Sequence, residues 1–380
     1  MGIVCALGCG KAEVLKNALS SSVRGMQKSQ DAIANSETFL GVCDFELPQI
    51  ENPRHSTRCN ALALLAISQI EESIRGAISK YGADRVGVVI GSSNTGMSEF
   101  QREHFFYTRQ NSPKKPSAFH GELGNVAEFI ADYFKIAAPS YVISTACSSS
   151  AKAFASAQKL LQNGVCDAVV CGGADSVCNF VVNGFASLGA ISKTLANPMS
   201  KNRSGINIGE GAAMFLMQKG GSAINLAGVG ESSDAYHATT PDPSGEGAAL
   251  SMRAALANAN LRPSDIQYVN LHGTGTVFND SMEAKAVCEV FGGDVFCSST
   301  KPMTGHALGA AGAIEAGLCY LMMSDMNGKN ALIEHVYDGE YDESLPRINL
   351  ARRGQAARVK YALSNSFAFG GSNASVILEA

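Results

Sequence analysis

Residues 141–152 read Tyr-Val-Ile-Ser-Thr-Ala-Cys-Ser-Ser-Ser-Ala-Lys, and they contain Cys147, the most informative residue of the chain. A short apolar run predicts a strand, small residues predict a tight turn, and an alanine-rich helix is expected at or just after Cys147. The unpaired N–H groups and the dipole at a helix N-terminus favour a thiolate over a thiol. Cys147 is therefore a candidate nucleophile, although a small buried hydrophobic residue is the other interpretation of this local sequence.

Strand-like and helix-like segments alternate along the rest of the chain, which predicts an α/β fold. Apolar runs predict strands at residues 86–90, 141–145, 168–171, 213–217, 268–271, 296–299, 361–364 and 374–378. Helices are expected at residues 58–81, 125–134, 149–161, 247–259, 280–291 and 309–323. Several of the strands are continuously apolar, which is typical of sheets that are buried on both faces.

A weak internal repeat indicates two similar halves. Residues 141–161 and 295–323 both follow the order strand, small-residue turn, and helix rich in alanine and glycine. The turn of the first segment carries Cys147, and that of the second carries Lys301 and His306. We expect one half at residues 1–222 and the other at residues 223–380.

Composition narrows the class of protein. The 380 residues are 46% hydrophobic and 17% charged, with a net charge of −4 and no run rich in Lys and Arg, which argues against nucleic acid as a partner. No run of 18 apolar residues predicts a membrane span, and the N-terminus lacks the pattern of a signal peptide. Eleven scattered cysteines without metal-ligand spacing predict reduced thiols and a cytoplasmic location. The basic pairs Lys114–Lys115 and Lys201 with Arg203 could be docking patches, though such pairs are more often solvated surface.

Four further clusters carry groups suited to chemistry. The first is His272-Gly-Thr-Gly-Thr276, directly after a predicted strand. The second is Ser299-Thr-Lys-Pro-Met-Thr-Gly-His306, and a helix containing Glu315 follows it. The third, at residues 365–373, reads Asn-Ser-Phe-Ala-Phe-Gly-Gly-Ser-Asn, and the fourth, at residues 185–190, reads Phe-Ala-Ser-Leu-Gly-Ala.

Together with Thr-Ala-Cys-Ser, these motifs resemble those of the β-ketoacyl-acyl carrier protein synthases, thiolase-fold condensing enzymes of fatty-acid and polyketide synthesis. The similarity is nearest to the elongating type, with its Cys-His-His triad, and it spans nearly the whole chain. The resemblance implies a thiolase-like fold, in which two similar halves form a layered αβαβα sandwich. It also implies an acyltransferase that condenses malonyl-carrier protein with an enzyme-bound acyl chain, in the elongation of fatty-acid, polyene or polyketide chains.

The resemblance assigns catalytic roles residue by residue. Cys147 would attack the thioester of an acyl carrier protein and hold the acyl chain. The backbone N–H groups of Cys147 and Phe369 would form the oxyanion hole. His272 and His306 would donate hydrogen bonds to the malonyl thioester carbonyl as it becomes an enolate, so neither a metal nor a tightly bound cofactor is expected.

Further residues would shape the site. Lys301 and Glu315 would form a buried charge pair, because a buried lysine without a partner is costly. Thr274 and Thr276 would bind the phosphopantetheine arm, although a plain turn role is as good an interpretation of either residue alone. Phe369 would also gate the acyl pocket, with the two glycines after it as hinges.

The chain departs from the family pattern in the substrate region. Ile206 stands where relatives have an aromatic residue and Ser204 where they have an acid, in a segment near the acyl pocket, so Ile206 is a candidate substrate-binding residue. Ala368 replaces the middle glycine of the gating loop, which restricts the backbone. These departures suggest a specialised enzyme for polyene or polyketide chains. Asp280 is expected to cap the helix that follows it.

Other members of the same superfamily fit less well. A thiolase needs a second cysteine near the C-terminus, and no cysteine lies beyond Cys319. Initiating synthases use a Cys-His-Asn triad, whereas the Thr-Gly-His context of His306 favours the two-histidine class. A chain-length factor has lost the nucleophile that Cys147 would supply. The resemblance implies an acyl carrier protein as partner and a homodimer, with a heterodimer containing a chain-length-factor-like subunit as the alternative.

Overall fold

Two mixed six-stranded sheets form the framework of the protein. The computed structural model describes residues 1–33, 36–110 and 112–380. The first sheet has the order β2 (Gly8–Cys9), β1 (Gly2–Cys5), β8 (Gly211–Gln218), β7 (Ala168–Asp175), β5 (Val86–Gly91), β6 (Ser140–Ile143). The second has the order β12 (Asn349–Leu350), β11 (Phe296–Ser298), β10 (Tyr268–Asn270), β13 (Tyr361–Ala368), β14 (Ser372–Glu379), β9 (Asn225–Ser233).

The two sheets repeat one pattern of strand pairing. Strands β6, β5 and β7 are parallel neighbours, and β8 and β1 follow them in antiparallel pairings. Strands β11, β10 and β13 are likewise parallel, and β14 and β9 follow in antiparallel pairings. Strand β6 therefore corresponds to β11, as the internal repeat in the sequence predicts.

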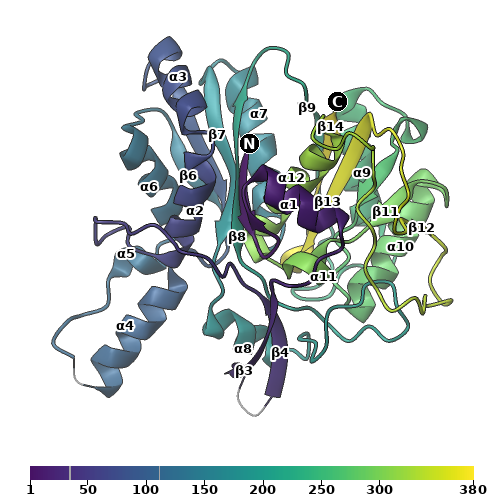
Figure 1. Ribbon diagram of the computed structural model, residues 1–380, viewed down its shortest axis with the longest axis horizontal. Coiled ribbons are helices and arrows are strands. Elements are labelled where there is room, and N and C mark those ends of the chain that lie inside the picture. The colour runs from purple at the N-terminus through teal and green to yellow at the C-terminus, as the bar shows by residue number, and fades with distance from the viewer. Residues whose placement is uncertain (34–35, 111) are drawn as a thin grey trace.

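Helices lie in three layers around the sheets (Figure 1). The middle layer, which contacts both sheets, contains α7 (Ser149–Gln162) and α12 (Ala311–Met323). The outer face of the first sheet is covered by α2 (Arg58–Ser68), α3 (Glu71–Tyr81) and α6 (Asn125–Phe134). The second sheet is covered by α9 (Glu246–Ala259), against which α10 (Val277–Phe291) packs. The predicted αβαβα sandwich is confirmed.

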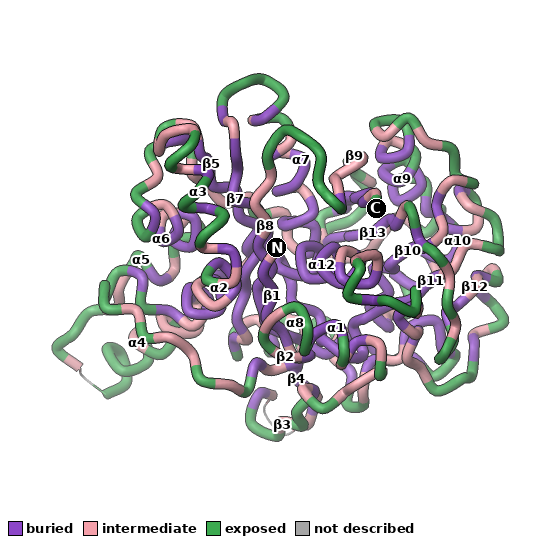
Figure 2. The backbone as a smooth tube through the Cα atoms, turned by 45° about the horizontal axis from the view of Figure 1, so that its top comes forward, coloured by how far each residue is buried: buried purple, intermediate pink, exposed green. Residues whose placement is uncertain are grey.

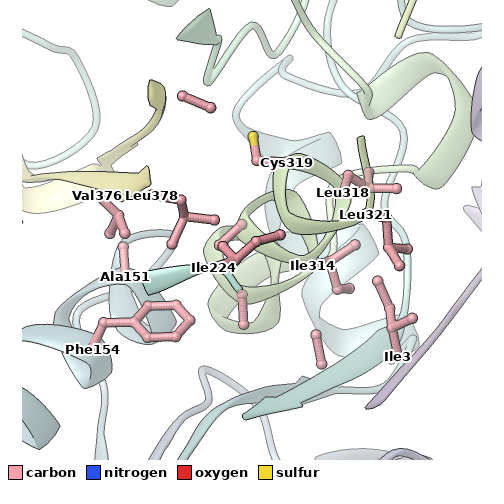
Figure 3. Close-up of a cluster of buried hydrophobic side chains, with 14 of the residues drawn as sticks. Ile3, Ala151, Phe154, Ile224, Ile314, Leu318, Cys319, Leu321, Val376 and Leu378 are labelled. Carbon is pink, nitrogen blue, oxygen red and sulfur yellow. The ribbon is translucent and has the colours of Figure 1, made fainter. Parts of the chain in front are cut away.

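The main core fills the space around the middle layer. Phe154 of α7 and Ile314 and Leu318 of α12 are almost fully buried, together with Ile3 and Val376 from strands of the two sheets (Figure 3). Burial is continuous through the centre of the molecule, and exposed segments lie at its periphery (Figure 2). Because both sheets bury apolar side chains against the same two helices, the halves share this central core.

The helix predicted at residues 58–81 is wrong as a single element, because it is divided into α2 and α3. The Gln69 side chain accepts a hydrogen bond from Ile3 N at 3.0 Å and donates to Ile3 O at 3.1 Å. The next residue, Ile70, leaves the helical region, with φ −128° and ψ 14°. A contact with the N-terminal strand therefore interrupts a helix that its apolar periodicity would have continued.

Several elements were not anticipated. Besides β1, β2, β9 and β12, they are α1 (Lys11–Leu19), β3 (Met26–Ile33), β4 (Ser36–Gly41), α4 (Met97–Arg109), α5 (Ala118–Gly121), α8 (Asn179–Ser187), α11 (Lys301–Thr304), η1 (Pro263–Asp265), η2 (Leu308–Ala310) and η3 (Phe369–Gly371). Helix α4 buries none of its residues and projects at the lower left of Figure 1. Within the described ranges, no helix has the length and apolarity needed to cross a membrane.

Candidate active site

Cys147 lies in a sharp turn between β6 and α7. Ala146, the residue before it, has a φ of 51°, in the left-handed region that is uncommon for a residue with a side chain. Neighbouring hydroxyl groups hold this conformation: Ser149 Oγ accepts from Thr145 N at 2.9 Å, and Ser148 Oγ donates to Thr145 O at 2.9 Å. The hydroxyl groups of Ser148 and Ser149 thus supply hydrogen bonds to backbone groups of the turn.

Two histidines lie beside the cysteine. The distance from Cys147 Sγ to His306 Nε2 is 2.9 Å, and one ligand atom from each of Cys147, His272 and His306 lies within 4.8 Å of the others. The two imidazole rings meet edge to face, with centroids 5.3 Å apart. All three residues are buried. The structure therefore brings the predicted triad together.

His306 is held through its backbone. His306 N donates to Asn207 O at 2.7 Å, and His306 O accepts from Gly209 N at 2.9 Å. Its Nδ1 is buried and has no hydrogen-bond partner among the described residues. The ring position is thus set by the main chain, and no contact at Nδ1 selects a tautomer.

His272 is oriented by a buried charge pair. Lys301 Nζ lies 2.5 Å from Glu315 Oε1 and 3.4 Å from His272 Nδ1, and it also donates to His272 O. Because an ammonium group can only donate, Nδ1 of His272 is the acceptor, and Nε2 carries the proton. The predicted pair of Lys301 and Glu315 is present, with both side chains 2% exposed.

Burial keeps both imidazoles neutral. The pKa of His272 lies well below its usual value because of burial, then the charge of Lys301 and the neighbouring His306. Burial and Lys301 likewise lower the pKa of His306 well below its usual value. Both rings are therefore uncharged at neutral pH, and each can accept or donate a proton.

The sequence-based expectation of an acidified thiol is wrong. Burial raises the pKa of Cys147 to about 12, although the charge of Lys301 and the backbone N–H groups of Phe369 and Cys147 oppose the increase. Desolvation outweighs the helix terminus because α7 begins only at Ser149 and the sulfur is buried at the base of the site. The Cys147 thiol therefore needs a base within reach, and His306 Nε2 occupies that position.

The glycine-rich turn after β13 brings Phe369 to the site. Gly370 and Gly371 have φ values of 81° and 72°, which only glycine adopts without strain. Ala368 has a φ of −112°, so its side chain is accommodated in extended backbone. Gly370 N donates to Ala238 O at 2.7 Å, and Asn373 Nδ2 donates to Asp234 Oδ1 at 2.6 Å. These contacts hold the turn against the loop that follows β9. The sequence did not predict this contact.

A cavity of about 280 Å³ opens over the triad. Its lining is mostly apolar and includes Phe185, Ile206, Phe278, Phe367 and Phe369. The Phe185 and Phe369 rings lie 5.4 Å apart. The cavity can thus hold an apolar chain against the three reacting groups.

The predicted substrate-binding residues lie on this cavity, but the capping role expected of Asp280 needs correction. Thr274, Thr276 and Ile206 line it, and Thr274 Oγ1 is 3.0 Å from Thr276 Oγ1. Thr276, not Asp280, caps α10, by accepting from Asn279 N. Asp280 instead accepts from Gly275 N and Met199 N.

Arg203 does not belong to a docking patch. Its guanidinium is buried, and it donates to Asp342 Oδ2 at 2.5 Å. Lys201 lies on the surface, in an ion pair with Glu340 at 2.6 Å. The burial of Arg203 explains why a basic pair in the sequence gives no basic patch here.

One supporting residue was missed by the sequence analysis. Glu283 is fully buried and accepts from His272 N and Gly273 N, both at 2.7 Å. Glu283 lies three residues after Asp280, so the two side chains project from the same side of α10. That pattern could have identified it as a residue facing the histidine turn.

Comparison with known proteins identifies the class. Residues 25–223 match the family described as "Beta-ketoacyl synthase, N-terminal domain", and residues 224–327 match "Beta-ketoacyl synthase, C-terminal domain". The chain is 30% identical to 3-oxoacyl-[acyl-carrier-protein] synthase 2 of Staphylococcus aureus (strain COL), over 100% of this chain and 96% of the relative. The protein therefore belongs to the β-ketoacyl synthase family, the thiolase-fold acyltransferases that carry out decarboxylative condensation.

Solved structures agree with this assignment. The chain is similar to a ketosynthase (ApeO) in complex with its chain length factor (ApeC) from Xenorhabdus doucetiae, with a TM-score of 0.95, 38% identity, and coverage of 100% of this chain and 96% of that one. It is also similar to a β-ketoacyl synthase from Burkholderia phymatum STM815, with a TM-score of 0.87, 26% identity, and coverage of 100% and 98%.

Proposed function

We propose that Cys147 is the nucleophile of a 3-oxoacyl-[acyl-carrier-protein] synthase that extends a carrier-bound acyl chain. The observation that carries this proposal is the 2.9 Å contact between Cys147 Sγ and His306 Nε2 at the base of an apolar cavity. The Cys147 sulfur attacks the acyl thioester while its proton passes to the neutral His306 ring. The tetrahedral oxyanion is held by the N–H groups of Cys147 and Phe369, and loss of one such donor typically costs about 2.7–4 kcal/mol of barrier. The pantetheine thiolate leaves and takes up a proton from solvent, so His306 keeps the proton of Cys147.

Condensation then uses the second histidine. The malonyl group enters on its own carrier, and its carboxylate leaves as CO₂, so that the electron pair of the broken bond forms an enolate. His272 Nε2–H, oriented by Lys301, donates to the enolate oxygen, and His306 is the second donor to it. The enolate carbon attacks the Cys147 thioester, and the sulfur is released as a thiolate that recovers its proton from His306.

Substrate contacts follow from the cavity lining. We propose that the Thr274 and Thr276 hydroxyls bind the phosphopantetheine arm, which is carried by the acyl carrier protein and is not a resident cofactor. Ile206 would border the acyl chain, and Phe369 would gate it. Aromatic side chains around the cavity support a planar, unsaturated polyene or polyketide chain as the substrate.

The partner is an acyl carrier protein, and the assembly is a dimer, either of this chain or with a chain-length-factor-like subunit. The heterodimer is supported by the relative from Xenorhabdus doucetiae, a ketosynthase in complex with its chain length factor. Co-expression with a related subunit that lacks the cysteine tests this assembly: stable co-purification would support the heterodimer, and a homodimer alone would contradict it.

We further propose a division into halves at residues 1–222 and 223–380, supported by the repeated pairing pattern of the two sheets. We place the protein in a reducing cytoplasm, since its eleven cysteines, all within the described part of the chain, are free thiols.

Intact mass spectrometry with a panel of acyl-carrier proteins tests the chemistry. The native protein should gain the mass of the acyl group, and Cys147→Ala should not. Cys9→Ala, which removes an exposed thiol away from the site, is the matched control and should load normally. Acyl-enzyme formation in Cys147→Ala would overturn the proposal. Preferred loading of ordinary saturated chains would contradict the polyene or polyketide assignment alone.

A further inference from the structure

A buried carboxylate at the end of β7 links the two sides of the active site. Asp175 has no exposed surface and lies outside the catalytic triad. Its Oδ1 accepts from Ser92 Oγ at 2.7 Å and from Asn94 N at 3.0 Å. Ser93 N donates to Oδ2 at 2.9 Å, and Thr95 N donates to Oδ1 at 3.3 Å. The loop after β5 is therefore wrapped around this one side chain.

The same loop supports the turn that carries Cys147. Ser93 Oγ donates to Ala146 O at 3.0 Å, and Ser92 N donates to Ile143 O at 3.2 Å, where β6 ends. Ala146 is the residue with a φ of 51°, a conformation that persists only where surrounding contacts impose it. The position of the Cys147 sulfur thus depends on the loop that Asp175 organises.

Asp175 Oδ2 also reaches the turn that carries His306. Gly309 N donates to Asp175 Oδ2 at 2.7 Å. Leu308, between His306 and Gly309, has a φ of 52°, so this turn is also held in an unfavourable conformation. A Cβ at Gly309 would lie 2.7 Å from Ser93 N and 2.8 Å from Asp175 Oδ2. The turn after His306 and the loop after β5 therefore approach as closely as a glycine allows.

We propose that Asp175 is a positioning residue that sets the distance between Cys147 and His306 by binding both of their supporting turns. The carboxylate accepts from the loop after β5 through both of its oxygens, and Oδ2 also accepts from Gly309 N. An amide in its place would put an NH₂ group against at least one of these N–H donors. The proposal rests on the roles given above to Cys147 and His306, and it explains why the two groups stay in contact although they lie on different halves of the chain.

The test is the rate at which iodoacetamide alkylates Cys147, read from the mass of its peptide, in Asp175→Asn. We expect the rate to fall about tenfold or more, because a lost hydrogen bond to a charged group is a large effect. In a His306→Ala background, Asp175→Asn should cause no further fall, because the partner that it positions is gone. In turnover, kcat should fall while the KM for the malonyl-carrier substrate stays within about twofold.

Gly309→Ala perturbs the same contact from the other side and decides the question if Asp175→Asn does not fold. Gly76→Ala in α3, where an added Cβ meets nothing within 4 Å, is the control and should react as the native protein does. An unchanged alkylation rate, or an equal fall with and without His306, would overturn the proposal. Acyl loading of the native protein and its loss in Cys147→Ala report separately on the proposed function.

Discussion

At the scale of single residues, burial sets the protonation states of the site more than neighbouring charges do. Burial keeps His272 and His306 neutral and the Cys147 thiol protonated, while Lys301 and Glu315 neutralise each other behind the rings. A charge pair with matched hydrogen bonds survives burial, whereas a lone thiolate does not. Proton transfer within the triad therefore replaces a standing thiolate as the source of reactivity.

The first prediction concerns the reactivity of Cys147 in the absence of acyl substrate. Because burial raises the pKa of its thiol to about 12, the alkylation rate of Cys147 should keep rising with pH between about 6 and 9. The measurement is the iodoacetamide rate at each pH, read on the Cys147 peptide. A plateau below about pH 8 would mean a thiolate stabilised by the helix terminus and would contradict the burial argument.

The second prediction concerns pH and stability. Burial raises the pKa of Glu283 from its ordinary 4.5 to about 7. A carboxyl group whose pKa is raised in the folded state stabilises the fold fully below its unfolded pKa, and this contribution is lost as pH rises through the folded pKa. Between pH 4.5 and pH 8 the loss should be roughly 3 kcal/mol of unfolding free energy.

Urea unfolding of the native protein and Glu283→Gln at several pH values measures this effect. The native protein should lose stability relative to the variant as pH rises from about 5 to 8, because the amide does not titrate. Parallel pH curves for the two proteins would show that Glu283 is not the source.

At the scale of elements, close packing explains why β9 was not anticipated. This strand contains Gly228 and Gly230, which lower strand propensity. At Gly230 an added Cβ would lie 2.0 Å from Ser251 O and 2.3 Å from Ala255 N, both in α9. The glycines that hide the strand in the sequence are thus the residues that let α9 lie directly on it.

The third prediction follows from this contact. Gly230→Ala should lower the unfolding free energy by about 1–3 kcal/mol, because the helix backbone must shift. Gly328→Ala, where an added Cβ meets nothing within 4 Å, is the matched control and should change stability little. Chemical denaturation compares the two, and equal stabilities would contradict the packing argument.

At the scale of the whole molecule, the middle layer couples the two halves. Helices α7 and α12 contact strands of both sheets, and their apolar side chains belong to one core. The residues of the site come from the two sheets on either side of this layer. Cys147 follows β6 of the first sheet, and His306 follows β11 of the second. Loss of packing in the layer should therefore affect both halves and the site together.

The fourth prediction tests that coupling. Leu318→Ala removes a fully buried side chain from α12 and should cost about 2–5 kcal/mol. Unfolding followed by circular dichroism and by hydrogen exchange in each sheet should remain one transition, shifted to lower denaturant. Leu250→Ala on α9, which replaces a side chain that is 48% exposed, is the control. Separate transitions for the two sheets would show that the halves are independent.

Elements whose signals are local could be predicted from the sequence. Apolar runs marked eight strands, the turns after β6, β10, β11 and β13 carried recognisable motifs, and the resemblance of these motifs to those of the β-ketoacyl synthases placed Cys147, His272 and His306 in one site. Periodicity and turn chemistry act between near neighbours, so they can be read without a fold.

Features that depend on distant contacts could be found only in the folded protein. Gln69 divides a helix because it binds Ile3, and Arg203 is buried by Asp342. The pKa of Cys147 rises because the completed fold excludes water from its sulfur, which outweighs the helix terminus that the sequence revealed. Desolvation is a property of everything packed around a group, and therefore no stretch of sequence around Cys147 could report it.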